Sequence, residues 1–498
     1  MSILQKLEGI RRDSGIRITP GLNDPLITRF AALDPRLESA ADDALRTYRE
    51  MEREFPDMLQ LDEREQVVRM HAEIINFYTD DAVNPYVTLA ASGPWIITAK
   101  GAVIYDTGGY GMLGFGHAPE AVLATMCKRQ VMANIMSANF SQLRFSNALR
   151  KEIGHRRGNC PYDGFMCLNS GSEAISLAAR ISDINARLAT CCEGTHAGKA
   201  IKHLALSGGF HGRTDRPAHY SDSSRSVYLR HLASFQDDHS LLTVTPNDLE
   251  ELEAVFERAR REGFFIESMF MEPVMGEGNP GLGLSRQFYD RARSLTREHG
   301  ALLLVDSIQA GLRAHGCLSI VDYPGFEDIE PPDMEAYSKA LNAGQFPLSV
   351  LAVTERGTRL YQKGVYGNTM TSNPRALDVA CQVLAQMTPQ VRANIRKRGQ
   401  KLLSRLQQLR DELGGLITEV QGTGLLVSCS LHPDFKSYGA GSIEEYMRMQ
   451  GVGVIHGGEN ALRFTPHFNI SPEEIELIVE ATRQALLHGP RRKSERAA

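Results

Sequence analysis

The chain has 498 residues, of which 42% are hydrophobic and 23% charged, and this predicts a soluble globular enzyme with two or three domains. The formal net charge of −5 is small for this length and gives no indication of a nucleic-acid or membrane partner. No apolar run approaches the roughly 18 residues of a membrane helix, and the first residues lack the apolar centre of a signal peptide, so neither is expected.

Residues 1–88 are expected to form an N-terminal helical extension. Prolines and weak periodicity predict an irregular arm over residues 1–35. Charged residues alternate with Ala and Leu over residues 37–78, which predicts two or three amphipathic helices. Plain packing explains this extension better than a lid or a subunit contact.

Residues 89–130 are predicted to be the N-terminal segment of a small domain. Two β-rich runs on either side of Lys100 and Gly101 predict a hairpin. The glycines after Asp106 allow the backbone to pass close to a neighbouring group, although an ordinary turn explains them equally well. Residues 122–136 are predicted to form a helix.

A large domain is predicted over residues 131–375, and it begins with a strand, a turn and a helix. The turn carries Ser170, Gly171 and Ser172. A helix start presents free N–H groups and the positive end of the helix dipole, which suits a phosphate. The same residue types also cap helices that bind nothing, so the motif is unspecific by itself.

The next strand leads to Phe210, His211 and Arg213. An aromatic ring at this place can lie on a planar cofactor, and the guanidinium can meet a carboxylate. A further strand ends at Glu272 and is followed by Glu277, which places acids just beyond a strand tip.

The apolar run before Asp306 predicts a buried strand of a parallel sheet, and Lys339 follows later between small and apolar neighbours. Ligands of open α/β sheets bind beyond the carboxyl ends of the strands, where Asp306 stands. A lysine can form a Schiff base with pyridoxal 5'-phosphate, and a carboxylate can keep the pyridine nitrogen protonated so that the ring accepts electrons. Either residue alone is explained as a helix cap or a solvated lysine. The pair indicates a pyridoxal phosphate site.

Residues 376–498 are predicted to form a C-terminal small α/β domain. Helices are expected over residues 390–413 and after Ser471, where Pro472 suits the first turn. Strands are expected over residues 420–430, 451–456 and 461–467.

Eight cysteines are scattered along the chain without the spacing of a metal site or a disulfide framework. They are therefore expected to be free thiols in a reducing cytoplasm, and no metal is expected.

Taken in this order, the motifs resemble those of the class III, or ω-, aminotransferases, which are fold type I pyridoxal phosphate enzymes. The resemblance covers about residues 90–485, and its motifs are Gly114-Phe-Gly-His-Ala-Pro, Asn169-Ser-Gly-Ser-Glu-Ala, Phe210-His-Gly-Arg-Thr, Glu272-Pro-Val-Met-Gly-Glu-Gly, Val305-Asp-Ser-Ile-Gln-Ala-Gly, Ser338-Lys-Ala-Leu, Gly367-Asn-Thr-Met-Thr-Ser-Asn-Pro and Arg463-Phe-Thr-Pro. It implies an α/β fold whose large domain has a mostly parallel seven-stranded sheet, with a smaller α/β domain beside it. It also implies a homodimer with shared active sites.

The resemblance implies a role for each candidate residue. Lys339 would be the Schiff-base lysine and proton shuttle, and Asp306 the partner of the pyridine nitrogen. The other implied cofactor contacts are Ser170, Gly171 and Ser172 at the phosphate, Thr369 from the neighbouring subunit, Phe210 and Ile308 on the ring faces, Gln309 at the phenolic oxygen, and His211 and Glu272 beside them.

Three residues are implied at the substrate. Arg213 would bind the far carboxylate of an ω-amino acid. Glu277 commonly pairs in this family with a switchable arginine that binds the α-carboxylate of the keto acid, and Gln421 stands at that position here. A neutral amide cannot replace a guanidinium fork, which argues against binding of 2-oxoglutarate in the usual mode.

The expected reaction is transfer of an amino group between an amine or ω-amino acid and a keto acid, aldehyde or ketone. The expected mechanism is ping-pong through pyridoxamine phosphate, with small-molecule donor and acceptor as partners. A pyridoxal phosphate racemase or epimerase of the same family is an open alternative. A non-catalytic protein of this fold is a second one, against which the presence of Lys339, Asp306, Gln309 and Thr369 argues.

Overall fold

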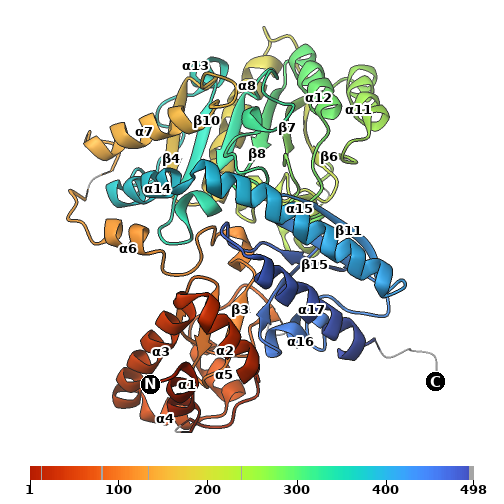
Figure 1. Cartoon of the computed structure of the whole chain (residues 1–498). Coiled ribbons are helices and arrows are strands. Elements are labelled where there is room, and N and C mark those ends of the chain that lie inside the picture. Colours follow the sequence, from red (N-terminus) through yellow and green to blue (C-terminus); the bar gives the residue numbers. More distant parts are fainter. Residues whose placement is uncertain (13, 80–81, 133, 237, 493–498) are drawn as a thin grey trace. The chain divides into compact units, whose positions relative to one another are not determined.

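The computed structural model describes residues 1–12, 14–79, 82–132, 134–236 and 238–492 (Figure 1). It divides into two compact units, one of which contains Ala121–Arg396 and Gly422–Leu426. The other contains Met1–Glu120, Lys397–Gln421 and Val427–Ala498. The domain boundaries expected from the sequence stay a prediction.

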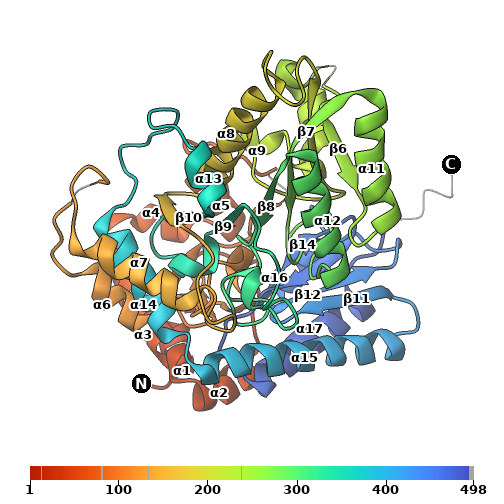
Figure 2. The same cartoon turned by 90° about the horizontal axis from the view of Figure 1, so that it is seen from above.

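The unit that contains Ala121–Arg396 is built on a seven-stranded sheet with the strand order β4-β10-β9-β8-β7-β5-β6 (Figures 1 and 2). Strands β6, β5, β7, β8 and β9 run parallel, whereas β10 is antiparallel to both of its neighbours. The expected mostly parallel seven-stranded sheet is therefore confirmed. The strands are β4 (Gly164–Leu168), β5 (Ala200–Leu206), β6 (Leu241–Val244), β7 (Phe264–Met271), β8 (Leu302–Asp306), β9 (Met334–Tyr337) and β10 (Ser349–Val353).

Strands β7 and β8 lie next to each other in this sheet, and all of their residues are buried. Runs of apolar residues form strands of this kind because both faces of a parallel sheet are covered. Helix α8 (Gly171–Thr190) contributes Ala174 and Ala178 to the hydrophobic core that also contains Leu304 of β8. This packing fixes the carboxyl end of β8, where Asp306 stands.

The expected helix over residues 122–136 is wrong for most of its length. Helix α6 (Glu120–Met126) ends early, and its last turn tightens as Lys128 N donates to Thr125 O. Apolar residues after the end of α6, such as Ile135 and Met136, are exposed. The spacing of apolar residues in this stretch therefore does not come from the buried face of a helix. The other helices are α7 (Phe140–Glu152), α9 (Asp215–Ala218), α10 (Arg225–His231), α11 (Leu249–Glu262), α12 (Arg286–His299), α13 (Glu355–Leu360), α14 (Pro374–Gln386) and α15 (Pro389–Glu412).

The irregular arm expected over residues 1–35 is also wrong, because two helices lie there. Pro25 occupies the first turn of α2, behind the N-cap Asn23, and Pro35 opens α3, behind the N-cap Asp34. Proline is tolerated at these positions because the first N–H groups of a helix have no intrahelical partner. The helices are α1 (Ile3–Arg12), α2 (Asp24–Leu33), α3 (Pro35–Glu54), α4 (Pro56–Gln60) and α5 (Glu63–His71), of which the last three confirm the amphipathic helices expected after residue 37.

This second unit also contains two four-stranded sheets, with the orders β1-β2-β3-β13 and β11-β12-β15-β14. The hairpin expected around Lys100 is confirmed, since β2 and β3 are antiparallel. The expected strand over residues 420–430 is in fact two strands, with Gly424 in a left-handed conformation between them. The strands are β1 (Thr88–Ser92), β2 (Trp95–Thr98), β3 (Val103–Asp106), β11 (Ile417–Thr423), β12 (Leu426–Leu431), β13 (Val452–Gly453), β14 (Ile455–Gly457) and β15 (Ala461–Phe464).

Two further helices complete the unit, α16 (Ile443–Met449) and α17 (Pro472–His488). Ser471 is the N-cap of α17 and forms a capping box with Glu474, and Pro472 stands in the first turn as expected. Within the part of the chain that the structure describes, no helix is both long and apolar enough to cross a membrane.

Candidate active site

Asp306 is the last residue of β8, at the carboxyl edge of the seven-stranded sheet, and its side chain is buried. Its Oδ2 lies 2.8 Å from Nδ1 of the buried His211, and its Oδ1 accepts a hydrogen bond of 3.1 Å from the backbone N–H of Ile308. Two donors therefore hold an acid at the sheet edge where α/β proteins bind ligands.

The start of helix α8 lies against the segment that follows Asp306. Ser170 is the N-cap, and its hydroxyl accepts from the backbone N–H of Glu173. A Cβ atom on Gly171 would lie 2.8 Å from Ile308 Cδ1, so the glycine lets the Ile308 side chain pack closely against the helix start. The N–H groups at the first positions of a helix have no intrahelical partner, and this start can therefore receive an anion.

Two more glycines bring the neighbouring loops to the same place. A Cβ atom on Gly212 would lie 2.5 Å from Ser172 Oγ, and one on Gly276 would lie 2.4 Å from Gln309 Cγ. The loop that carries Phe210 and Arg213 therefore packs on the start of α8. The loop after β7 packs on Gln309.

Glu272 joins these two loops. Its carboxylate accepts hydrogen bonds from the backbone N–H of Phe210, at 3.1 Å, and of Gly276, at 2.8 Å. Burial raises the pKa of the Glu272 carboxyl to about 7, and the charge of Asp306 adds to the rise, whereas His211 and the two N–H groups lower it.

Lys339 follows β9, the strand beside β8. Ala336 is the residue opposite Asp306 in that pair, so Lys339 comes shortly after the point where the two strands are level. Its backbone lies in the left-handed region, with φ of 45°, a conformation that costs a residue other than glycine roughly 1–2 kcal/mol. Its neighbour Ser338 donates to Leu348 O and anchors the turn.

Thr369 lies in an exposed turn near the start of α8 of the same chain. Asn368 Nδ2 donates to Glu173 Oε1 at 2.5 Å, and Asn134 Nδ2 donates to Thr369 O at 3.1 Å. The expected contact of Thr369 with a phosphate in the neighbouring subunit stays a prediction.

The three expected substrate residues are not all in one unit. Arg213 is exposed, and its guanidinium carbon lies 5.7 Å from the centre of the Phe210 ring. Glu277 is half-buried in the loop after β7. Gln421 belongs to the other compact unit, so its expected pairing with Glu277 stays a prediction. The segment after Gln421 is nevertheless tied to that loop, since Thr423 Oγ1 donates to Gly281 O at 2.9 Å.

These residues fit pyridoxal 5'-phosphate. Gln309 Oε1 and His211 Nε2 are buried polar atoms without a hydrogen-bond partner among the residues that the structure describes, and such atoms are rare in a folded protein. The same edge of the sheet carries an acid for the ring nitrogen, a helix start for the phosphate and, after the strand beside β8, a lysine for the aldehyde. These donors and acceptors suit the polar groups of that cofactor.

Two residues that support this site, Glu173 and Ser221, were not predicted from the sequence. Glu173 accepts from the backbone N–H groups of Asn169 and Ser170, and it completes a capping box whose Ser-x-x-Glu spacing was visible in the sequence. The hydroxyl of Ser221 accepts a hydrogen bond from the backbone N–H of His211, and no local sequence pattern predicts that contact.

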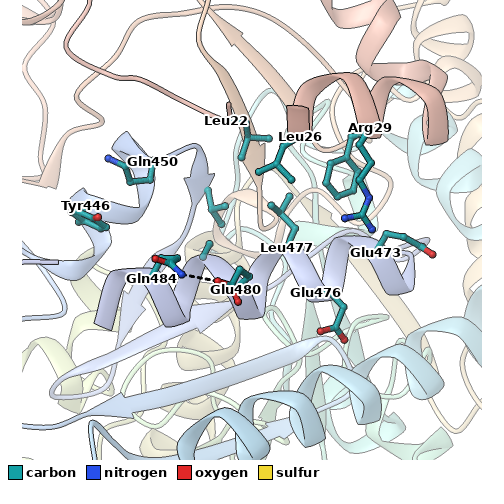
Figure 3. A pocket seen from close by; sticks show the side chains of 13 residues that line it. Leu22, Leu26, Arg29, Tyr446, Gln450, Glu473, Glu476, Leu477, Glu480 and Gln484 are labelled. Atoms are coloured by element: carbon teal, nitrogen blue, oxygen red, sulfur yellow. Dashed lines mark hydrogen bonds between the residues drawn. The ribbon is translucent and has the colours of Figure 1, made fainter. Parts of the chain in front are cut away.

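A cavity of about 380 Å³ lies elsewhere, in the unit that contains Met1–Glu120 (Figure 3). Figure 3 shows Leu22 and Leu26 facing Leu477 of α17, with Arg29 on the side of Glu473. None of the candidate site residues lines this cavity, so it is not the candidate active site.

A larger hollow of about 900 Å³ lies beside strand β4, in the same unit as Asp306. Thr369 lines it together with apolar residues that are largely exposed, among them Ile135, Met136 and Leu143. An exposed apolar surface of this kind is typical of protein–protein contacts.

Comparison with known proteins gives matches over most of the chain. The family model described as Aminotransferase class-III matches residues 78–486. The chain is 28% identical over 407 residues to the acetylornithine aminotransferase of Neisseria meningitidis serogroup B. The aligned stretch covers 80% of this chain and 94% of that protein.

Two solved structures are similar in fold. The ornithine aminotransferase of Toxoplasma gondii ME49 has a TM-score of 0.71 and 21% identity, covering 87% of this chain and 97% of that one. The N-acetylornithine aminotransferase of Stenotrophomonas maltophilia has a TM-score of 0.65 and 22% identity, covering 84% and 98%.

Proposed function

The chain belongs to the class III aminotransferase family, and we propose that it moves the amino group of an amine or ω-amino acid to a keto acid, aldehyde or ketone in two half-reactions. The observation that carries the proposal is the buried pair of Asp306, which ends β8, and His211, which lies in the loop after β5, with Lys339 just after the adjacent strand β9. The family match and the relatives named as aminotransferases favour transamination over the racemase and scaffold alternatives.

Pyridoxal 5'-phosphate is the cofactor of this family, and when bound it supplies an aldehyde and an electron-accepting ring. We assign the phosphate to the start of α8 and the ring nitrogen to Asp306. The other residues that would hold the cofactor are Phe210, Ile308, Gln309 and Thr369.

The residues of the chain have separate tasks. Asp306 is kept in place by His211 and holds a proton on the ring nitrogen, because an ionised carboxylate beside a base stabilises its protonated form. The amine of Lys339 would take a proton from the donor carbon in the first half-reaction and supply a proton to the acceptor carbon in the second. Half-burial of Lys339 limits water around that amine.

The donor is proposed to carry a terminal amine and a carboxylate some carbons away. Arg213, exposed beside the Phe210 ring, offers a guanidinium fork for that carboxylate. The relatives named for ornithine and acetylornithine support a donor of this kind. Gln421 lacks the charge for a second carboxylate, so an aldehyde or a monocarboxylic keto acid is the preferred acceptor.

The working unit is proposed to be a homodimer, because the apolar hollow that Thr369 lines needs a cover and a second copy of the chain supplies one. All eight cysteines are free, which supports a reducing cytoplasm as the compartment.

The test is a donor panel without acceptor. Purified chain loaded with pyridoxal 5'-phosphate is mixed with single amines, and the absorbance of the bound cofactor is followed together with the carbonyl product. One product per active chain and a lasting change of the spectrum are expected, and later addition of acceptor should restore it. Interconversion of donor enantiomers without carbonyl product would contradict the proposal.

A further inference from the structure

Glu335 is a completely buried acid in β9 that the proposed mechanism does not use. Its carboxylate has four hydrogen-bond partners. Tyr162 OH lies at 2.5 Å, the hydroxyls of Ser307 and Ser319 lie at 2.6 Å each, and the backbone N–H of Ile320 lies at 3.0 Å. Each partner can donate, so an ionised carboxylate has a donor for each of its lone pairs.

The four donors and the buried Glu335 carboxylate fix one another in position. Burial raises the pKa of the Glu335 carboxyl above its ordinary value, and the hydrogen bonds from Ser307, Ser319, Tyr162 and Ile320 oppose part of that rise. A buried acid without these donors would be costly, so the four donors and the carboxylate hold one another in a single arrangement.

The position of the cluster relates it to the proposed catalytic residues. Ser307 directly follows Asp306, and its N–H donates to Ala336 O, next to Glu335. Lys339 comes four residues after Glu335, in the turn that follows β9. The Ser307–Glu335 bond therefore crosses from the segment of Asp306 to the segment of Lys339.

We propose that Glu335 is a positioning residue that fixes Asp306 and Lys339 relative to each other through its hydrogen bond with Ser307. This inference rests on the proposed function, in which both residues contact one cofactor. A displacement of well under 1 Å between two such groups is enough to weaken a shared contact.

The chain offers a matched control in Glu267 of β7. It is also buried and also accepts a hydrogen bond of 2.5 Å from a tyrosine hydroxyl, that of Tyr220. Ser268 pairs with Leu302, the first residue of β8, so Glu267 lies at the opposite end of the strands, roughly 15 Å from the level of Asp306.

The experiment compares Glu335→Gln, Ser307→Ala, Ser319→Ala and Glu267→Gln in the full chain. The Tm of each variant without cofactor measures the structural cost. The dissociation constant of pyridoxal 5'-phosphate and the pH midpoint of the absorbance change of the bound cofactor measure positioning.

Glu335→Gln and Ser307→Ala are expected to weaken cofactor binding at least fivefold and to raise the pH midpoint by at least half a unit. If Asp306 holds the proton on the ring nitrogen less firmly, the ring carries less positive charge. A less positive ring repels a proton on the Lys339 nitrogen less, so that nitrogen keeps its proton to a higher pH. Ser319→Ala and Glu267→Gln are expected to lower the Tm and to leave the midpoint in place.

Equal effects of all four variants on the midpoint, or a lower Tm with no shift in any, would overturn the inference. If Glu335→Gln does not fold, Ser307→Ala alone gives the answer, because it removes only the connecting hydrogen bond. A wild-type chain that binds no pyridoxal 5'-phosphate would instead refute the proposed function itself.

Discussion

His211 Nδ1 lies 2.8 Å from Asp306 Oδ2, and both side chains are buried at the carboxyl edge of the sheet. A buried carboxylate next to one imidazole has a fixed direction, and its remaining oxygen accepts from the Ile308 N–H. Asp306 is thus oriented before any ligand arrives, as preorganised electrostatic catalysis requires.

Asp306→Asn is expected to retain bound pyridoxal 5'-phosphate and to lose several orders of magnitude in kcat. The amide is nearly isosteric with the carboxylate but cannot hold a proton on the ring nitrogen. Steady-state kinetics with cofactor occupancy measured on the same sample is the check. A loss below about tenfold, roughly 1.4 kcal/mol, would show that Asp306 does not have this role.

Lys339→Ala is expected to abolish turnover while the fold and much of the cofactor affinity remain, because the start of α8 supplies most of the phosphate contact. Turnover is measured together with cofactor binding by equilibrium dialysis. Lys363→Ala, at an exposed lysine in the same unit, is the control and should behave as wild type. Near-normal activity of purified Lys339→Ala would exclude the proposed mechanism.

Glu272→Gln tests the raised pKa of this acid. The folded pKa of about 7 exceeds the ordinary 4.5, so the folded state keeps a proton that the unfolded state releases. The protonated acid therefore stabilises the fold below pH 4.5, and this stabilisation declines as the pH rises to about 7. The full shift corresponds to roughly 3 kcal/mol.

Urea unfolding of the cofactor-free chain at several pH values is the measurement for that variant. The difference in unfolding free energy between wild type and Glu272→Gln should fall between pH 4.5 and 7 and be constant above. Glu298→Gln, at an exposed acid of α12, controls for the general loss of a carboxylate. A pH-independent difference would mean that Glu272 titrates normally.

Ile135→Asp and Met136→Asp are expected to convert the dimer to a monomer, because each places a charge in the apolar hollow beside β4. Sedimentation equilibrium gives the mass. Leu188→Asp changes an apolar side chain that is also exposed but lies outside the hollow, and it should stay dimeric. A wild-type chain that is monomeric at micromolar concentration would refute the dimer.

Arg213→Ala is expected to raise KM for carboxylate-bearing donors at least tenfold and to change KM for a simple amine little, since a charge-assisted contact is worth about 1.5–3 kcal/mol. Gln421→Arg should improve 2-oxoglutarate as acceptor. Arg216→Ala removes a guanidinium from the same stretch and is the control. Strong activity with 2-oxoglutarate in the wild type, unaffected by Arg213→Ala and Gln421→Arg, would contradict both assignments.

Local rules were enough to predict several parts of this fold. Ser170 and Ser471 precede helices because a serine hydroxyl can accept from a free N–H group of the first turn. Asp306 ends a buried strand because the apolar run before it can be covered only inside a sheet.

Other parts depend on residues far apart in the chain. The four donors to Glu335 come from residues 162, 307, 319 and 320, and no periodicity links them. Helix α2 was missed for a different reason. Pro25 was read as a helix breaker, although it stands in a first turn where a proline costs the helix no hydrogen bond.

The parallel pairing of β13 with β3 has a consequence for synthesis on the ribosome. Val452 is the partner of Tyr105, so the sheet that begins with β1 receives its fourth strand only when nearly the whole chain has been made. Until then β3 has an open edge, and such edges invite pairing with other chains. At 5–20 residues per second, this exposure lasts on the order of tens of seconds. The sheet that contains β3 is thus begun early and completed late in synthesis, and a chaperone can protect its open edge in the meantime.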